Sequence, residues 1–585
     1  MPSVDGDDPV AIQLRASARR LAGVAVFSGM VNLLTLSGSV YMLQIYDRVI
    51  PSRNIATLLG LSVIVLVAYL LQGYFDALRS RMLARIGALF DAELQPLIYF
   101  ALVSLPLRGT RTILAQQPLR DLDQVRLFLS GAGPTAFLDM PWIPLFLIPL
   151  FLFHPAIGVV ALTGTVAIIV MTLLTEWQSR SATRISTEGS AQRQVLSDAL
   201  RQNADVIRAL GMTGRLAERW SLANDHYINH NTRLADVHAN LGAAAKILRF
   251  VLQSAALGVG AYLVIVDQAS GGIIIASTIV MGRALAPVEV ALTNWKQFVA
   301  AREGIGRLRA ILKVTAPPSA PAVVLQRPNH SLTVEDLSVV VPGTDKTVVS
   351  RVSFELRPGH GLALLGASAA GKSSLAKALV GIWPAAAGTV RLDGAALDRW
   401  SYDDLGRHIG YLPQDVALFD GTVATNIARF DESATSESIL DAARVSGAHE
   451  MILRLPDGYD TRIGERGVSL SAGQRQRIGL ARAVFGHPFL IVLDEPNANL
   501  DADGENSLVN AIETLRSEQN IVIVISHRPN ALAALNMAMV IHGGRAIAFG
   551  PREAVFARVA QSAVRAGVPP KQSGRASRLA AGAAS

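Results

Sequence analysis

Apolar residues follow two different patterns along the chain. Long apolar runs occur between residues 21 and 291, whereas short apolar runs alternate with helical stretches after residue 330. A membrane-spanning helix needs about 20 mostly apolar residues, so the long runs predict spans, and the short runs predict an α/β domain. The run 137–175 is too long for one span and is divided at His154-Pro155. The six predicted spans are residues 21–45, 55–75, 137–153, 155–175, 247–266 and 271–291.

The spans are predicted to form three hairpins, because short and long connections alternate. The long connections 76–136 and 176–246 are rich in arginine, while the short turns carry little basic charge apart from Arg48 and Arg53. Cytoplasmic loops have an excess of Lys and Arg. The long connections and both chain termini are therefore expected in the cytoplasm, and the helical spacing of their apolar residues predicts helices that continue beyond the bilayer.

Composition supports this division into a membrane half and a second domain. Half of the residues are hydrophobic and only 17% are charged, against roughly 25% in average globular proteins. Prolines 317, 318 and 321 mark a linker. The expected organisation is a cytoplasmic N-terminal segment 1–20, a transmembrane domain 21–312, a linker 313–329, an α/β domain 330–565 and a disordered Ala/Gly/Ser-rich tail 566–585.

Charge and cysteine content exclude several kinds of chemistry. The net charge of +8 would suit a nucleic-acid partner, but the basic residues are scattered and form no run of five or more. Membrane topology explains them better, so no nucleic-acid partner is expected. The absence of cysteine excludes disulfides, thiolate metal sites and a cysteine nucleophile.

Two charged residues, Arg283 and Glu289, fall in or near the sixth predicted span. A charge at membrane depth is costly, so such residues usually face a cavity or a charged partner. The alternative is that the span lies higher and both side chains reach the interface. The sequence leaves these two interpretations open.

A phosphate-binding loop follows an apolar strand in the second domain. Residues 366–373 read G-x-x-x-x-G-K-S and are followed by a helix. Glycines let backbone N–H groups surround phosphate, the lysine reaches the β- and γ-phosphates, and the serine hydroxyl binds Mg²⁺. The predicted nucleotide-binding residues are Gly366, Ala367, Ser368, Ala369, Ala370, Gly371, Lys372, Ser373 and Ser374.

A second buried strand ends in two carboxylates, Asp494 and Glu495. Next to a phosphate loop, Asp494 is expected to hold Mg²⁺ directly or through water. Glu495 is expected to act as the general base that activates water. Without the loop, the same pair would indicate no more than a solvated acidic turn.

Three further motifs complete a pattern. Residues 470–477, with the sequence LSAGQRQR, open a long helix, while Gln414 and His527 each lie at the end of a strand. In this order, after a phosphate loop, the set resembles the ATPase of ABC transporters. The resemblance implies an ATP hydrolase that uses ATP and Mg²⁺, with a six-helix exporter-type transmembrane domain ahead of its P-loop ATPase domain.

The resemblance also implies residue roles. Catalysis would involve Glu495, His527 as the γ-phosphate sensor, Gln414 as the switch that contacts the metal, and Lys372. Mg²⁺ would be held by Ser373, Gln414 and Asp494. The signature residues Ser471, Gly473 and Gln474 would close on ATP bound by the other subunit of a homodimer. The sequence departs from the common pattern at Ala369 and Ala472, where glycine is usual, and around 341–342, where no aromatic residue is available to stack on adenine.

A narrower resemblance extends over residues 20–560. The segments 41–54, 139–142, 209–212, 281–289 and 410–415 resemble type I secretion permease/ATPases, and 461–467 resembles the exporter X-loop. This implies an inner-membrane protein exporter that works with a membrane-fusion adaptor and an outer-membrane channel on an unfolded secreted protein. No peptidase-like domain precedes the first span, as in the branch whose substrates keep their secretion signal. The alternatives are a lipid or small-peptide exporter and a non-transporting regulatory membrane ATPase.

Overall fold

The computed structural model describes residues 8–109, 117–315, 325–464 and 469–565 of the chain. Contacts divide the chain into two compact units, residues 1–106 with 110–317 and residues 318–585 with 107–109, and each is described by itself. The tail 566–585, predicted to be disordered, lies outside the described residues, as do part of the predicted linker and residues 465–467 of the X-loop-like segment.

The first unit is helical. Its elements are α1 (Pro9–Thr35), α2 (Ser37–Gln44), the π-helix η1 (Ile45–Val49), α3 (Ile50–Ser52), α4 (Ile55–Leu107), α6 (Gln117–Ser130), α7 (Gly133–Asp139), the 3₁₀-helix η2 (Met140–Trp142), α8 (Ile143–Phe153), α9 (Pro155–Gln202), α10 (Ala204–Ala209), α11 (Thr213–Ile265), α12 (Gly271–Thr293) and α13 (Trp295–Val314).

Among the described residues, six helical stretches are long and apolar enough to cross a membrane, and each overlaps one predicted span. Two of them, α4 and α11, have 53 residues each. At 1.5 Å per residue they are about 80 Å long, against roughly 30 Å for the hydrocarbon core of a bilayer. The prediction of helices that continue beyond the membrane agrees with these lengths.

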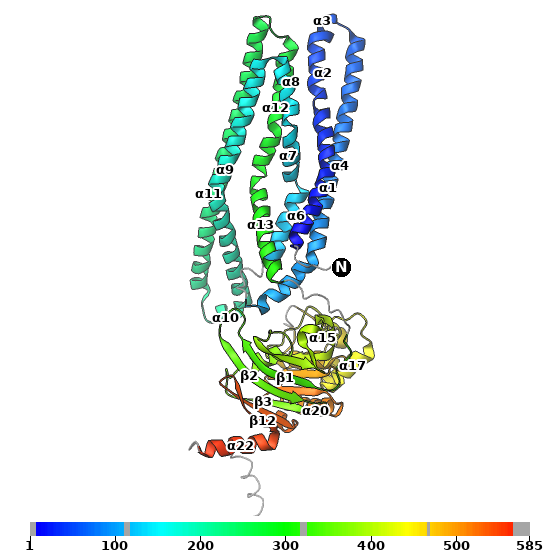
Figure 1. Ribbon diagram of the computed structural model, residues 1–585, viewed down its shortest axis with the longest axis vertical. Coiled ribbons are helices and arrows are strands. Elements are labelled where there is room, and N and C mark those ends of the chain that lie inside the picture. Colours follow the sequence, from blue (N-terminus) through cyan, green and yellow to red (C-terminus); the bar gives the residue numbers. More distant parts are fainter. Residues whose placement is uncertain (1–7, 110–116, 316–324, 465–468, 566–585) are drawn as a thin grey trace, which may run out of the picture. The chain divides into compact units, whose positions relative to one another are not determined.

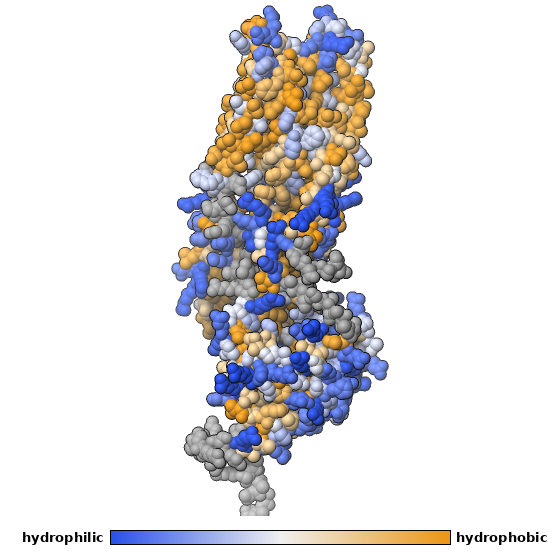
Figure 2. Space-filling view, in the orientation of Figure 1, coloured by the Kyte–Doolittle hydropathy of each residue, from blue (hydrophilic) through white to orange (hydrophobic). Residues whose placement is uncertain are grey.

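The long helices α9 and α11 are mainly apolar along only part of their length. α9 and α11 run side by side down to α10 (Figure 1). Apolar residues cover the upper part of the unit in the same orientation, and hydrophilic residues cover the lower lengths of α9 and α11 (Figure 2). This change along each helix is the one expected where a helix leaves a bilayer.

The hairpin turns are set by local sequence. His154 is extended and its Nδ1 accepts a hydrogen bond from the N–H of Ala156 at 3.2 Å, while Pro155 occupies the first turn of α9. A capping acceptor followed by proline is a common helix start. The predicted division of the run 137–175 at His154-Pro155 is confirmed.

Two ion pairs connect helices of this unit. Glu289 accepts a hydrogen bond from Arg249 of α11 at 2.9 Å. Arg79 of α4 contacts both carboxylate oxygens of Asp139 at 3.0 and 3.1 Å. Arg283 is exposed on α12. Glu289 thus has the charged partner that one interpretation required, whereas Arg283 stays accessible.

The second unit is an α/β fold. Its strands are β1 (Leu332–Val340), β2 (Thr347–Leu356), β3 (Gly361–Leu365), β4 (Ala387–Leu392), β5 (Ala395–Ala396), β6 (Ile409–Leu412), β7 (Gly421–Thr422), β8 (Arg462–Ile463), β9 (Leu490–Asp494), β10 (Ile521–Ile525), β11 (Met537–His542) and β12 (Arg545–Pro551). Its helices are α14 (Lys372–Leu379), α15 (Tyr402–His408), α16 (Val423–Ile427), α17 (Ser436–Val445), α18 (His449–Leu453), α19 (Ala472–Val484), α20 (Ala502–Ser517), α21 (Pro529–Ala533) and α22 (Arg552–Arg565).

The central sheet of this unit has the strand order β12-β11-β3-β10-β9-β6 and is parallel except for β12. Alternate residues of β9 belong to two hydrophobic clusters, one on each face of the sheet. A strand that is buried on both faces reads as a continuous apolar run, which is the pattern of residues 490–493. The predicted fold class, a six-helix transmembrane domain followed by a P-loop α/β domain, is confirmed.

Candidate nucleotide site

The phosphate loop connects β3 to α14 at the carboxyl edge of the central sheet, where ligands bind in open α/β folds. Gly366 has φ +154° and Gly371 has φ +102°. A Cβ at Gly366 would lie 2.3 Å from the carbonyl oxygen of Ile541, and one at Gly371 would lie 2.5 Å from that of Val348. Only glycine fits at these two positions, so the backbone of the loop can close around an anion.

Lys372 is 7% exposed and its ammonium group is held inside the loop. Its Nζ donates to the carbonyl oxygens of Gly366 at 2.7 Å and Ala367 at 3.0 Å. Backbone carbonyls of the phosphate loop thus position the lysine, and its third N–H can donate to a phosphate oxygen. Ala369, where glycine is usual, has φ +63°, a strained conformation for a residue with a Cβ.

Asp494 ends β9 next to Ser373, the first-turn residue of α14. The Ser373 hydroxyl donates to Asp494 Oδ1 at 3.2 Å, and Asp494 as a residue is 2% exposed. Burial raises the pKa of Asp494; the Ser373 hydrogen bond lowers it, Glu495 raises it further, and Lys377 and Lys372 lower it. The net increase in the pKa shows that nearby cations do not fully offset the burial of this carboxylate. A bound cation beside Asp494 would therefore be favourable.

Glu495 follows Asp494 in a left-handed conformation, φ +50°. Its N–H donates to the carbonyl oxygen of Ile525 at 2.9 Å, which ties it to the end of β10. Its carboxylate accepts a hydrogen bond from Gln414 Nε2 at 3.1 Å. The structure therefore brings together Gln414, Glu495 and the Asp494–Ser373 pair, as the sequence predicted from separate motifs.

His527 is exposed, but the residues on both sides of it are anchored. The Ser526 hydroxyl is buried and donates to Asn497 Oδ1 at 3.2 Å, and Arg528 forms an ion pair with Glu505. Sequence reasoning missed Ser526 and Asn497 as supports. Their position next to His527 and Glu495 was the available signal.

The signature residues form a separate cluster at the start of α19. Ser471 caps the helix: its Oγ accepts from the N–H of Gln474 at 3.2 Å, and Gln474 Oε1 accepts from the N–H of Ser471 at 2.8 Å. Both side chains are thus used for capping. A Cβ at Gly473 would lie 2.8 Å from the carbonyl oxygen of Asn499, so this glycine is needed for close packing.

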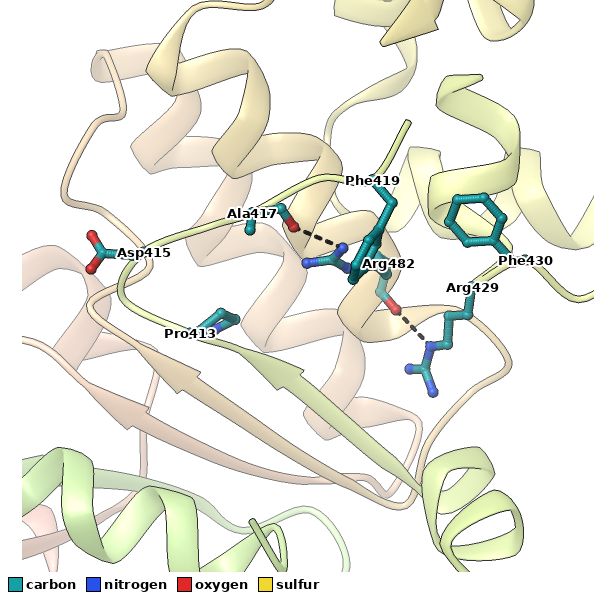
Figure 3. A pocket seen from close by; sticks show the side chains of 7 residues that line it. All are labelled: Pro413, Asp415, Ala417, Phe419, Arg429, Phe430 and Arg482. Carbon is teal, nitrogen blue, oxygen red and sulfur yellow. Dashed lines mark hydrogen bonds between the residues drawn. The ribbon is translucent and has the colours of Figure 1, made fainter. Parts of the chain in front are cut away.

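Two half-buried arginines lie beside the segment after Gln414 (Figure 3). Arg482 donates to the carbonyl oxygen of Ala417 at 3.0 Å, and Arg429 donates to that of Arg482 at 2.9 Å. Burial lowers the pKa of both guanidinium groups, that of Arg429 to about 10 with a further contribution from Arg482. A pocket of about 340 Å³ lies here, lined by Pro413, Asp415, Ala417, Phe419, Arg429, Phe430 and Arg482. Its lining contains no residue of the phosphate loop.

Membrane-spanning helices and a P-loop ATPase unit with a signature helix, joined in one chain, define an ABC exporter. Family profiles agree: that of the ABC transporter transmembrane region matches residues 21–286, and that of the ABC transporter ATPase matches residues 349–498.

Individual relatives show to which group of ABC exporters the chain belongs. The chain is 49% identical over 552 residues to the type I secretion system ATP-binding protein PrsD of Rhizobium meliloti, covering 94% of each protein. It is 26% identical over 543 residues to the cyclolysin secretion/processing ATP-binding protein CyaB of Bordetella pertussis, covering 92% of this chain and 76% of that one. A bacterial Atm1-family ABC exporter solved with ATP bound has the same fold, with a TM-score of 0.78, 22% identity and coverage of 95% and 99%. The chain belongs to the type I secretion system ATP-binding proteins of the ABC transporter family.

Proposed function

We propose that this chain is the inner-membrane ATPase of a type I secretion system and exports an unfolded polypeptide. The observation that carries the proposal is 49% identity over 94% of the chain to a protein of that system, combined with a nucleotide site whose predicted groups meet in one place. ABC-type ATP hydrolysis coupled to transport belongs to this family.

We assign the chemistry of hydrolysis to the groups at the edge of the sheet. The loop N–H groups and Lys372 would bind the β- and γ-phosphates, and Glu495 would accept a proton from the attacking water. His527 would contact the γ-phosphate. Oxygen donors suit Mg²⁺, so Ser373, Asp494 and Gln414 would hold this ion, which neutralises phosphate charge when bound.

The proposed oligomeric state rests on the number of nucleotide-site motifs in one chain. A chain has one phosphate loop and one signature, and we propose that two chains form a homodimer in which Ser471, Gly473 and Gln474 contact the nucleotide of the partner. The exposed Arg283 would then line a polar passage between the copies, where its charge costs less than in lipid. Both termini and the ATPase unit would lie in the cytoplasm.

The proposal implies partners and a test. A membrane-fusion adaptor and an outer-membrane channel would continue the passage to the outside. Co-expression of the chain with both partners and a candidate secreted protein should give export that requires Glu495 and the last ~60 residues of the cargo, about the size of a small folding unit. Export that survives removal of this C-terminal segment would contradict the signal assignment. ATPase stimulation by lipid but never by polypeptide would favour a lipid exporter.

A further inference from the structure

A buried glutamine connects the signature helix to the turn that carries Glu495. Gln476 lies in the second turn of α19 and is 2% exposed. Its Nε2 donates to the carbonyl oxygen of Pro496 at 3.1 Å. Buried amides need partners, so this bond accounts for a polar residue in an otherwise apolar helix face.

The carbonyl that Gln476 contacts belongs to the turn that points the Glu495 carboxylate. Glu495 is held in a left-handed conformation, and Pro496 next to it has a fixed φ. The turn is restrained from the other side as well, where Asn497 accepts the hydroxyl hydrogen bond of Ser526. Gln476 therefore restrains this turn from the side of the signature helix.

Other contacts also join α19 to the loop 495–501. The first turn of α19 packs at Gly473 on the carbonyl of Asn499. In the second turn, Arg477 forms an ion pair with Asp501 at 2.5 Å, and Asp501 in turn caps α20. Ser471 and Gln476 are five residues apart, about 7.5 Å along a helix at 1.5 Å per residue.

We propose that Gln476 is a positioning residue through which one ATP site of the dimer controls the other. The inference rests on the proposed function, in which the N-terminus of α19 contacts the ATP of the partner chain. Engagement of that ATP fixes α19, and Gln476 then fixes Pro496 and directs Glu495 of its own chain toward water. Hydrolysis in one site thus depends on occupancy of the other.

The first test replaces Gln476 by methionine, which has a similar length but no donor. Gln476→Met should lower kcat for ATP hydrolysis about tenfold, the effect of losing roughly one hydrogen bond, and leave the Kd for ATP within about twofold. Ser446→Ala is the matched control, because it removes another buried hydrogen bond, to the carbonyl of Ala443, away from the site. An unchanged kcat in Gln476→Met, or an equal loss in Ser446→Ala, would overturn the proposal.

The second test separates positioning from general damage with differently tagged mixed dimers. One chain always carries Glu495→Gln, so that turnover is measured only in the site of its partner. That first chain either binds ATP or carries Lys372→Ala as well; the partner is either wild type or Gln476→Met. These four dimers form a double-mutant cycle.

With a wild-type partner, emptying the first site should slow turnover in the second about tenfold. With a Gln476→Met partner, turnover is already low and should fall less than twofold further. Equal losses in both pairs would refute coupling through Gln476. Absence of ATPase activity in the wild-type homodimer would instead contradict the proposed function, so the two failures are distinguishable.

Discussion

At the scale of single residues, the nucleotide site depends on a few groups held in costly conformations. Glu495 and Ala369 have positive φ angles, and Asp494 is a carboxylate in a buried position. The paired strands β9 and β10 fix the backbone at Asp494 and Glu495, and the loop that contains Ala369 is anchored between β3 and α14. Three predictions follow from individual side chains.

Glu495→Gln should keep ATP binding within about threefold and lower turnover at least 100-fold, since general-base catalysis contributes about 10² to 10⁴. Lys372→Ala should instead weaken ATP binding at least tenfold, because it removes a charge-assisted contact worth about 1.5–3 kcal/mol. Phosphate release and nucleotide binding measured on both variants separate the two roles. Turnover at the wild-type rate in Glu495→Gln would remove Glu495 from the role of base.

Asp494→Asn should stabilise the chain when Mg²⁺ and ATP are absent. The folded pKa of Asp494 is raised, so the folded state binds this proton more tightly than the unfolded chain, and the ionised group costs stability above its ordinary pKa of about 4. The gain in unfolding temperature should be largest at pH 8 and vanish near pH 4. Asp345→Asn, at an exposed site, is the control. A gain that does not depend on pH would contradict the assignment.

Ala369→Gly should raise stability by about 0.5–1 kcal/mol, because glycine adopts φ +63° without the steric cost that a Cβ imposes. Thermal unfolding of the full chain in detergent measures this effect. A lower unfolding temperature would show that the loop tolerates alanine without strain.

At the scale of elements, one helix supplies the cap of another. Asp47 lies on the π-helix η1, and its carboxylate accepts hydrogen bonds from the Ser270 hydroxyl at 2.6 Å and the Gly272 N–H at 2.9 Å. Ser270 itself provides no side-chain cap for α12. A carboxylate at a helix N-terminus is favourable, so Asp47 connects the first and sixth spans at one end of the helical unit.

Asp47→Ala should lower the stability of the full chain by about 1 kcal/mol, the usual effect of losing a cap. Gln268→Ala, an exposed change in the same turn, should have no effect on the unfolding temperature. Because the chain has no cysteine, cysteines introduced at 47 and 272 can report the contact by disulfide formation. No cross-link together with unchanged stability would contradict the capping role.

At the scale of the whole molecule, the signature and the phosphate loop of one chain must serve different sites in the proposed dimer. Lys372→Ala and Ser471→Ala chains, each inactive alone, should regain part of the wild-type ATPase activity when mixed, since both lesions fall on one composite site and the other is intact. A chain with both substitutions mixed with wild type is the control, because it damages each site of the mixed dimer once. Equal activity in the two mixtures, with mixed dimers shown to form, would refute the shared-site geometry.

The sequence by itself determined that six helices can span a membrane and that an ABC ATPase domain follows them; its assignment of the nucleotide-site residues stays a prediction. These depend on short-range signals: about 20 apolar residues for each span, glycines and a lysine at fixed spacing, and a buried strand ending in two carboxylates. Such signals lie within one element and its neighbours in the chain, so they can be recognised without knowledge of the tertiary structure.

Only the tertiary structure decided which partners support these residues. Gln476 with Pro496, Asp47 with Gly272, and Arg249 with Glu289 are each separated by 20 to 225 residues in sequence. For a glutamine in a helix or an aspartate near a turn, the local sequence does not identify the partner. These contacts are determined when apolar burial packs the elements together, because desolvated polar groups must then find partners across the chain.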